Sequence, residues 1–209
     1  MFSGLIEDVG AVLAVTSMPS GLRARIRTPL TAELSEGESI AVNGVCLTVV
    51  ETDAATFSAE LSPETARVTT LGQLTAGAVV NLERPLKFDG RFGGHFVLGH
   101  VDGRGQVVAI REESDFHLVR VRFPTRLKAL IVEKGSIAVD GISLTVTALT
   151  DGEFDVQIVP YTWEHTNLHE VVVDDAVNLE CDIIGKYVVN AVDVASGDSD
   201  PQAEGRKTT

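Results

Sequence analysis

The chain has 209 residues, 44% of them hydrophobic, and a formal net charge of −13 at pH 7. Nucleic acids and anionic membranes attract clustered lysine and arginine, so this acidity argues against both as partners, and no apolar run approaches the roughly 20 residues of a membrane helix. Two cysteines, Cys46 and Cys181, indicate no disulfide framework; together with an opening unlike a secretory signal, they predict a cytoplasmic protein in a reducing compartment.

Short strands are predicted through the first half of the chain. Residues 10–15 and 22–27 alternate apolar with other residues, which is the period-two pattern of a half-buried strand. The pair Asn43-Gly44 lies between apolar runs and predicts a tight type I′ hairpin, because both central residues of that turn need positive φ. A short helical turn is predicted over 63–67, since a proline suits the first helical position.

The second half contains the same kinds of element. Residues 86–94 form a connection rich in glycine, and 116–123 alternate as a strand does. A proline-led helical turn is predicted over 124–130, and Asp140-Gly141 predicts a second tight hairpin. Beyond Val194 the chain becomes too polar to fold on its own.

The two halves are related by sequence. Residues 39–49 return 97 positions later as 136–146, with 8 of 11 residues identical. This period is too long for a solenoid, whose units run about 20 to 50 residues. One domain was therefore duplicated, and any site that it forms is expected twice. Further matching blocks pair 61–71 with 158–168, 80–83 with 177–180, and 4–12 with 99–107.

The duplication sets the expected domain organisation. We expect an N-terminal domain over 1–92, a C-terminal domain over 93–187, and a short C-terminal segment with a disordered tail over 188–209. Many short strands separated by glycine and aspartate predict an all-β fold of antiparallel barrels or sandwiches, and closure into a barrel would remove exposed sheet edges.

The strand after each hairpin turn carries small polar side chains on one face. Alternation places Cys46 and Thr48 together, and in the second repeat Ser143 and Thr145 fall on the same face. A hydrogen-bonding face retained in both copies predicts the wall of a ligand pocket. The alternative is a buried cysteine acting as a small hydrophobe beside ordinary strand threonines. The retained threonine, with cysteine replaced by serine, favours the pocket.

The junction between the repeats, 93–103, contains two histidines and four glycines. Glycine allows a backbone to approach a ligand closely. No cysteine pair or helical HExxH pattern accompanies the histidines, so we predict no metal site. The sequence does not decide between a structural and a functional role for His95. His100 takes the place of Leu5 of the first repeat, and this asymmetry favours a functional, titratable group.

Other common catalytic patterns are absent from the sequence. It has no GxGxxG opening a helix, no GxxxxGK[ST] loop and no GxSxG elbow. These absences argue against a dehydrogenase, a nucleotide phosphotransferase and a serine hydrolase. His165 and His169 receive no role.

Four segments together resemble the riboflavin synthase family of the alpha-chain type, a family of lumazine-binding double barrels. They are 1–7, 39–49, 94–101 and 134–146, and the resemblance extends from residue 1 to about 187. Each motif is modest alone, whereas their order and spacing are specific.

The resemblance implies two tandem six-stranded Greek-key antiparallel β-barrels, with short helices and a C-terminal helix or tail, assembled as a homotrimer. The implied reaction takes two molecules of 6,7-dimethyl-8-ribityllumazine and transfers a four-carbon unit, which gives riboflavin and 5-amino-6-(ribitylamino)uracil. It needs no cofactor, and lumazine synthase is a candidate partner.

The resemblance also assigns site residues. For catalysis it implies His100 as a proton-transfer group, with Cys46, Ser143 and Thr145 orienting the rings or relaying protons, and Ser39 supporting the first site. It implies an N-terminal site lined by Gly4, Leu5, Ile6, Cys46, Leu47, Thr48, Leu61, Ser62, Pro63, Glu64, Thr65 and Ala66. It implies a C-terminal site lined by Gly99, His100, Val101, Lys134, Ser143, Leu144, Thr145, Ile158, Val159, Pro160, Tyr161, Thr162 and Trp163.

Two features depart from the family pattern. Residues 181–192 are short and rich in β-branched residues where family members have a longer helix that assembles the trimer, and Pro63 is expected to reshape one wall of the first pocket. A non-catalytic lumazine or flavin carrier, or an antenna protein, is the main alternative function, and a purely structural double-barrel module is the third. The paired histidines and the repeated polar face favour the enzyme.

Overall fold

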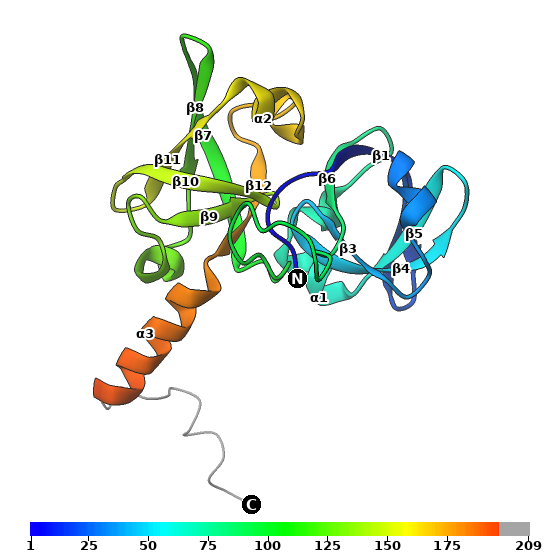
Figure 1. Ribbon diagram of the computed structural model, residues 1–209, viewed down its shortest axis with the longest axis horizontal. Coiled ribbons are helices and arrows are strands. Elements are labelled where there is room, and N and C mark those ends of the chain that lie inside the picture. The colour runs from blue at the N-terminus through cyan, green and yellow to red at the C-terminus, as the bar shows by residue number, and fades with distance from the viewer. Residues whose placement is uncertain (197–209) are drawn as a thin grey trace, which may run out of the picture.

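Two closed antiparallel barrels of six strands each make up the body of the protein (Figure 1). The structure is a computed structural model, and it describes residues 1–196. The expected all-β double barrel is confirmed. The N-terminal barrel contains β1 (Asp8–Met18), β2 (Gly21–Arg27), β3 (Ser39–Val42), β4 (Val45–Thr52), β5 (Thr56–Leu61) and β6 (Val79–Glu83). The C-terminal barrel contains β7 (Gly103–Glu113), β8 (Phe116–Arg122), β9 (Ser136–Val139), β10 (Ile142–Leu149), β11 (Glu153–Ile158) and β12 (Ala176–Cys181).

Both barrels have the same circular strand order. The first runs β1-β2-β5-β4-β3-β6, and the second follows the same path through its equivalent strands. Register shifts occur between Val12 and Ala14 in the first barrel and between Val107 and Ala109 in the second, with a second such pair on β4 and β10. Bulges bend strands and help a sheet to close. Both repeats therefore keep the register shifts that help to close the barrel, in addition to the similar sequence.

Short helical segments connect the strands. The turn expected after Pro63 is helical, and the Ser62 side chain caps it by accepting a hydrogen bond from the Thr65 N–H group. The turn expected over 124–130 is a 3₁₀ helix, with Pro124 at its N-cap. The α-helices are α1 (Pro63–Val68), α2 (Pro160–Glu164) and α3 (Ile183–Ser196), and the 3₁₀ helices are η1 (Pro29–Glu33), η2 (Thr70–Gln73), η3 (Thr125–Leu130) and η4 (Asn167–His169).

The two hairpin turns meet at the seam between the barrels. Asn43 and Asp140 both have a φ of 44°, as a type I′ turn requires, and a Cβ added to Gly44 would lie 2.5 Å from the Gly141 nitrogen. The Asn81 side chain donates to the Asp140 carbonyl at 3.0 Å, and the Asn178 side chain donates to the Asn43 carbonyl at 2.9 Å. These reciprocal bonds indicate a two-fold relation between the halves.

Asp140 is the one carboxylate among these seam residues. Burial raises its pKa to about 6, against hydrogen bonds from the Asn178 backbone and the Asn167 side chain that lower it. A raised pKa means that the folded state binds this proton more tightly than the unfolded chain does. The contribution of Asp140 to stability is therefore greatest below the ordinary aspartate pKa of 3.8 and is lost as the pH rises through about 6.

We predict that Asp140→Asn removes this pH dependence. We compare the free energy of unfolding of the variant with that of the wild type at each pH. As the pH rises from about 4 to about 7.5, this difference should shift in favour of the variant by up to about 3 kcal/mol. The amide loses one acceptor for Asn167, which costs a pH-independent amount, so the test is the change with pH. Urea denaturation at both pH values measures it, with Asp193→Asn on exposed α3 as the control. A difference that does not change with pH would contradict the prediction.

The helix α3 projects away from the C-terminal barrel (Figure 1), and none of its residues is buried. It begins where the Asp182 carboxylate accepts a hydrogen bond from the Ile184 N–H group at 2.9 Å. Residues 188–196, expected as part of a short C-terminal segment, belong to this helix. The disordered tail expected further on falls on residues that lie outside those described, apart from 195 and 196.

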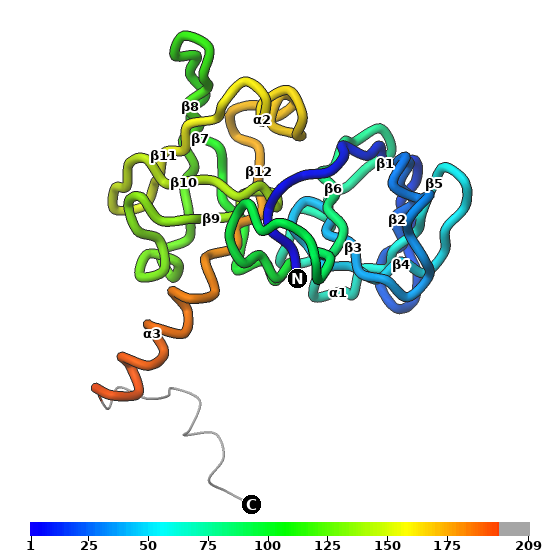
Figure 2. The backbone as a smooth tube through the Cα atoms, in the orientation of Figure 1, coloured from blue at the N-terminus to red at the C-terminus, as the bar shows by residue number. Residues whose placement is uncertain are grey.

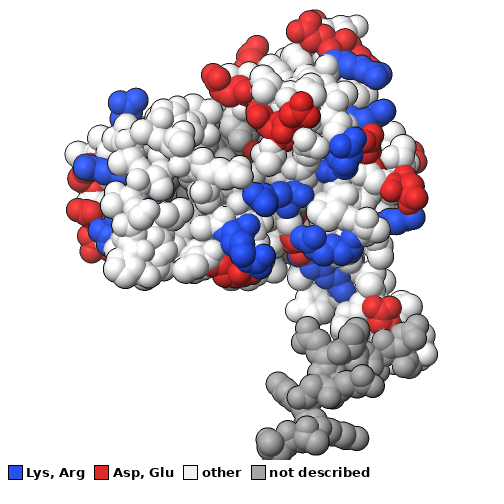
Figure 3. Space-filling model, turned by 180° about the vertical axis from the view of Figure 1, so that it is seen from behind, with Lys and Arg blue, Asp and Glu red and all other residues white. Residues whose placement is uncertain are grey.

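Charge is distributed without a large region of one sign on the face drawn in Figure 3. Several basic side chains lie close together near the place where the two barrels meet, with acidic side chains among and around them, and much of the N-terminal barrel carries no charge away from its outer edge. Among residues 1–196, no helix has both the length and the apolar character that crossing a bilayer requires.

Candidate functional site

Each barrel receives a segment from the other half of the chain. The Gly4 carbonyl accepts a hydrogen bond from the Ser143 N–H group at 2.8 Å, and the Gly99 carbonyl accepts one from the Cys46 N–H group at 3.0 Å. Between these contacts, Phe2 and Val97 pair as an isolated β-bridge. The chain start and the junction therefore cross between the barrels side by side (Figure 2).

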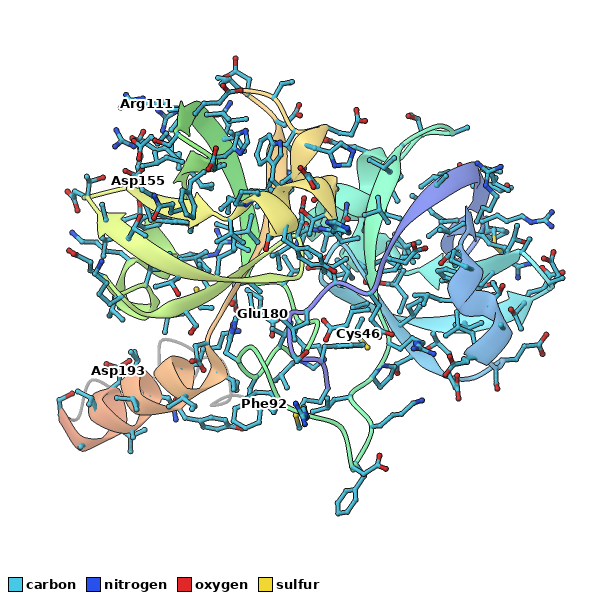
Figure 4. All side chains as sticks on the ribbon, turned by 45° about the horizontal axis from the view of Figure 1, so that its top comes forward. Cys46, Phe92, Arg111, Asp155, Glu180 and Asp193 are labelled. Carbon is cyan, nitrogen blue, oxygen red and sulfur yellow. The ribbon has the colours of Figure 1, made fainter. Side chains whose placement is uncertain are left out.

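Two buried glutamates anchor these crossing segments. The carboxylate of Glu83 accepts from the Ser3 N–H group at 2.7 Å and from the Gly4 N–H group at 3.0 Å. Glu180 accepts from three consecutive backbone N–H groups, those of 98–100, at 2.7, 2.9 and 3.1 Å. Burial raises the pKa of both carboxyl groups, and the backbone hydrogen bonds oppose that rise. Figure 4 places Glu180 and Cys46 where the two barrels meet.

Sequence reasoning overlooked both glutamates. They end the repeated block 80–83 and 177–180, so the signal was present in the duplication. A glutamate kept at the end of a buried strand in both copies needs a partner, because a buried carboxylate is costly without hydrogen bonds.

The crossing segments contact the barrel opposite to the one that the resemblance implied, as the positions of Gly4, Ile6, Gly99 and Val101 show. Gly4, Leu5 and Ile6 were expected beside Cys46, whereas Gly4 contacts Ser143 and Ile6 packs against the core of the C-terminal barrel. Gly99, His100 and Val101 were expected beside Ser143, whereas Gly99 contacts Cys46 and Val101 packs against the N-terminal core. Two aligned repeats show that these segments are equivalent, but the alignment cannot show that each segment crosses to the other repeat.

The polar face on the hairpin strands has the predicted geometry. Leu47 is buried in the barrel, while Cys46 is half-buried and Thr48 exposed on the outer face. Ser39 pairs with Thr48 across β3 and β4, so its side chain lies on the same face. The second barrel repeats this arrangement with half-buried Ser143, half-buried Leu144 and exposed Thr145.

His95 lies against one of these faces. Its Nδ1 atom is 2.7 Å from the Ser143 hydroxyl, and either atom can donate the hydrogen bond. Burial lowers the pKa of His95, and the nearby Asp182 charge opposes this. The lowered pKa favours the neutral imidazole near pH 7, and its Nδ1 atom shares one hydrogen bond with the serine hydroxyl. The structure brings together two residues that the sequence left unconnected.

His100 presents a different arrangement. Its backbone N–H group is fixed by Glu180, while its ring is exposed and makes no hydrogen bond within residues 1–196. The ring is thus held at its base, beside the Gly99 contact with Cys46, and is open to an approaching ligand.

The outer walls of the two faces come from segments that follow β5 and β11. Leu61 and Ile158 are buried at the strand ends, and the remaining wall residues lead into α1 and α2. Lys134 is exposed in the turn before β9, with a φ of 65°, and its N–H group donates to the Val146 carbonyl at 2.8 Å. The expected wall residues therefore follow the strands β5 and β11, which pair with the hairpin strands β4 and β10.

A separate hollow lies beside the N-terminal barrel and the connection that follows it. Its volume is about 480 Å³, and Leu5 and Ser39 are the expected site residues that line it, with Glu83 and the connection 84–91. On the two polar faces, Thr48 and Thr145 are exposed, whereas Cys46 and Ser143 are half-buried beside the crossing segments. No group of three or more His, Cys, Asp or Glu side chains able to hold a metal ion occurs in the described part of the chain.

Comparison with known proteins relates both halves of the chain to one family. Residues 3–85 and 98–182 each match the lumazine binding domain family. Riboflavin synthase of Bacillus subtilis is 40% identical over 189 residues, which cover 90% of this chain and 88% of that protein. Riboflavin synthase of Mycobacterium tuberculosis (strain H37Rv) is 44% identical over 193 residues, covering 90% and 96%.

Solved structures with the same fold contain bound ligands. LumP complexed with riboflavin has a TM-score of 0.82 and 25% identity, covering 87% of this chain and 99% of that one. LumP complexed with 6,7-dimethyl-8-(1'-D-ribityl) lumazine has a TM-score of 0.79 and 24% identity, with the same coverage. The latter likeness establishes the fold alone.

Proposed function

This chain belongs to the riboflavin synthase family of lumazine-binding enzymes, and from that membership we propose that it converts two molecules of 6,7-dimethyl-8-ribityllumazine into riboflavin and 5-amino-6-(ribitylamino)uracil. A four-carbon unit passes from one lumazine to the other. The observation that carries the proposal is the duplicated polar face, because a reaction between two identical molecules calls for two similar binding sites.

We assign one lumazine to each barrel. The N-terminal site consists of Cys46, Leu47, Thr48 and the wall 61–66, completed by the crossing segment 99–101. The C-terminal site consists of Lys134, Ser143, Leu144, Thr145 and the wall 158–163, completed by 4–6. Backbone groups and threonine hydroxyls would pair with the pyrimidinedione edge, whose donors and acceptors are costly to bury unpaired.

The reaction would begin with removal of a proton from the 7-methyl group of one lumazine. The resulting carbanion adds to the partner ring, and a later elimination releases the pyrimidine product. We assign the proton transfer to the exposed ring of His100 and the orientation of the two rings to Cys46, Ser143 and Thr145, with Ser39 supporting the first site. His95, neutral and bonded to Ser143, would hold the serine hydroxyl in one orientation. Holding both rings in contact makes the bimolecular step effectively unimolecular.

Because Thr48 and Thr145 are exposed on the two polar faces, we propose that a neighbouring copy covers each face in a homotrimer. The helix α3 supplies an apolar surface for assembly: Ile184, Val188 and Val192 recur at intervals of four residues and are 56%, 57% and 60% exposed. Residues spaced by four lie on one helix face. Three apolar side chains in line, exposed on a projecting helix, suit contact with a second copy.

We predict that the double substitution Val188→Asp and Val192→Asp produces a monomer. The added carboxylates would have to be buried in the interface, which is costly without partners. Riboflavin formation should fall about 10-fold or more, because two sites on separate copies no longer face each other. Light scattering after size-exclusion chromatography measures the mass. Asn190→Asp on the opposite helix face is the control, and a double variant that remains an oligomer would exclude α3 from the interface.

The proposed reaction is tested by incubating the purified protein with 6,7-dimethyl-8-ribityllumazine alone under nitrogen. We expect the lumazine absorbance to fall while riboflavin appears, and heat-denatured protein to give neither change. A carrier or antenna protein would bind the lumazine without consuming it, and that outcome would replace the enzyme with the alternative function.

A further inference from the structure

The two barrels differ in one aromatic contact. In the C-terminal barrel, His117 on β8 stacks on Trp163 of α2, with ring centroids 3.8 Å apart and ring planes 3° apart. In the N-terminal barrel the equivalent positions are Leu22 and Ala66. The equivalence follows from the register, since His117 faces Ile158 across the sheet as Leu22 faces Leu61. The planar stack therefore occurs in one half only, because the equivalent positions of the other half carry no aromatic residue.

The stack adjoins the C-terminal substrate site. Its tryptophan belongs to the wall 158–163, and the backbone N–H group of Trp163 donates to the Val159 carbonyl at 3.0 Å. Trp163 packs against the same core as Ile6, which arrives on the crossing segment that completes this site. A rotation of the indole plane would consequently change the shape of this wall of the site.

His117 is held mainly by this stacking contact. Its Nδ1 atom is buried and has no hydrogen-bond partner within residues 1–196, and its Nε2 atom is 4.0 Å from the exposed Glu112 carboxylate. Leaving a ring nitrogen buried without a partner is unfavourable. A leucine, as in the other barrel, would fill the position without that cost, so the flat ring is the feature that distinguishes His117.

We propose that His117 is a positioning residue for the C-terminal substrate site. By stacking on Trp163 it fixes the plane of the indole, and the indole presents a rigid aromatic wall to the planar lumazine ring. The N-terminal barrel has no such wall, because Leu22 and Ala66 occupy the equivalent positions there. Binding at the C-terminal site therefore depends on the stack, while binding at the N-terminal site does not. This inference rests on the proposed function.

Trp163 is the only tryptophan of the chain, so the ligand-free tryptophan emission reports on this wall alone. The probe is riboflavin, which the proposed reaction does not consume. His117→Leu installs the residue of the other barrel, His117→Phe keeps a flat ring without nitrogens, and Leu22→Met is the matched control in the N-terminal half. Thermal unfolding of each variant establishes that it is folded.

We expect His117→Leu to change the ligand-free emission of Trp163 and to weaken riboflavin binding, measured by its quenching, about 3- to 10-fold. His117→Phe and Leu22→Met should stay within about 2-fold of the wild type. With lumazine as substrate, His117→Leu should raise KM with little change in kcat, since positioning acts on binding.

Three results would overturn the proposal. The first is that His117→Leu binds riboflavin as tightly as the wild type does, and the second is that His117→Leu and His117→Phe weaken binding equally. The third is that riboflavin does not quench Trp163 emission in the wild type, although the wild type turns lumazine over. Failure of the proposed function looks different, because the wild type itself would then leave lumazine unconsumed.

Discussion

Replacing His100 with alanine is expected to lower kcat for riboflavin formation about 10²- to 10⁴-fold, the range typical for loss of a positioned proton-transfer group. The ring is exposed and makes no hydrogen bond within residues 1–196, so the free energy of unfolding should change little. The backbone N–H group that Glu180 holds is retained in the variant. Steady-state rates with 6,7-dimethyl-8-ribityllumazine, together with urea denaturation, separate chemistry from folding.

The matched control is His169→Ala, which removes an imidazole whose Nδ1 atom lies 2.6 Å from the Thr166 carbonyl, outside the proposed site. Its rate should remain near that of the wild type. Added imidazole should partly restore the rate of His100→Ala and leave His169→Ala unchanged. Full turnover in His100→Ala without added imidazole would remove His100 from the mechanism.

The second large effect is expected at Gly99. A Cβ at this position would lie 2.5 Å from the Cys46 Cβ and 2.7 Å from the Cys46 nitrogen, and the φ of 79° already disfavours an L side chain. Strain at positive φ costs about 1–2 kcal/mol, and overpacking against a fixed strand adds about 1–3 kcal/mol. Gly99→Ala should therefore lose about 3 kcal/mol of unfolding free energy and most of its activity, because the segment carrying His100 is forced away from Cys46.

Gly37→Ala separates the two causes of this loss. Gly37 has a φ of 87°, and an added Cβ would meet nothing within 4 Å. This variant should lose only the backbone part, about 1–2 kcal/mol, and keep its activity. Urea denaturation and the riboflavin assay measure both quantities. If Gly99→Ala loses no more stability than Gly37→Ala and stays active, the close contact with Cys46 does not shape the site.

Local sequence signals predicted much of the fold. Alternation over 22–27 and 116–123 marked strands that the structure contains as β2 and β8, because the period of side-chain direction in a strand is a local property. Asn43-Gly44 and Asp140-Gly141 predicted the hairpins for the same reason, since the turn needs two residues at positive φ. Closure into barrels came from the family resemblance, as residue patterns alone allowed sandwiches as well.

Contacts between distant segments could not be read from the sequence. His95 and Ser143 are 48 residues apart, and only the packing of the two halves brings them together. The crossing of 4–6 and 99–101 was missed because equivalent segments in a duplicated chain align equally well with either barrel. The length of α3 was also hard to read from the sequence. Its consecutive valines, Val188 and Val189, disfavour a helix slightly, whereas Asp182 caps its first turn.

The central claim is that two identical lumazines react with each other on paired sites. Its most direct test is the mass balance of the reaction in the absence of oxygen, with lumazine, riboflavin and 5-amino-6-(ribitylamino)uracil quantified by chromatography over the time course. We predict that two lumazines are consumed for each riboflavin and each pyrimidine formed. Lumazine recovered intact from a protein that binds it, or riboflavin formed without the pyrimidine, would contradict the claim.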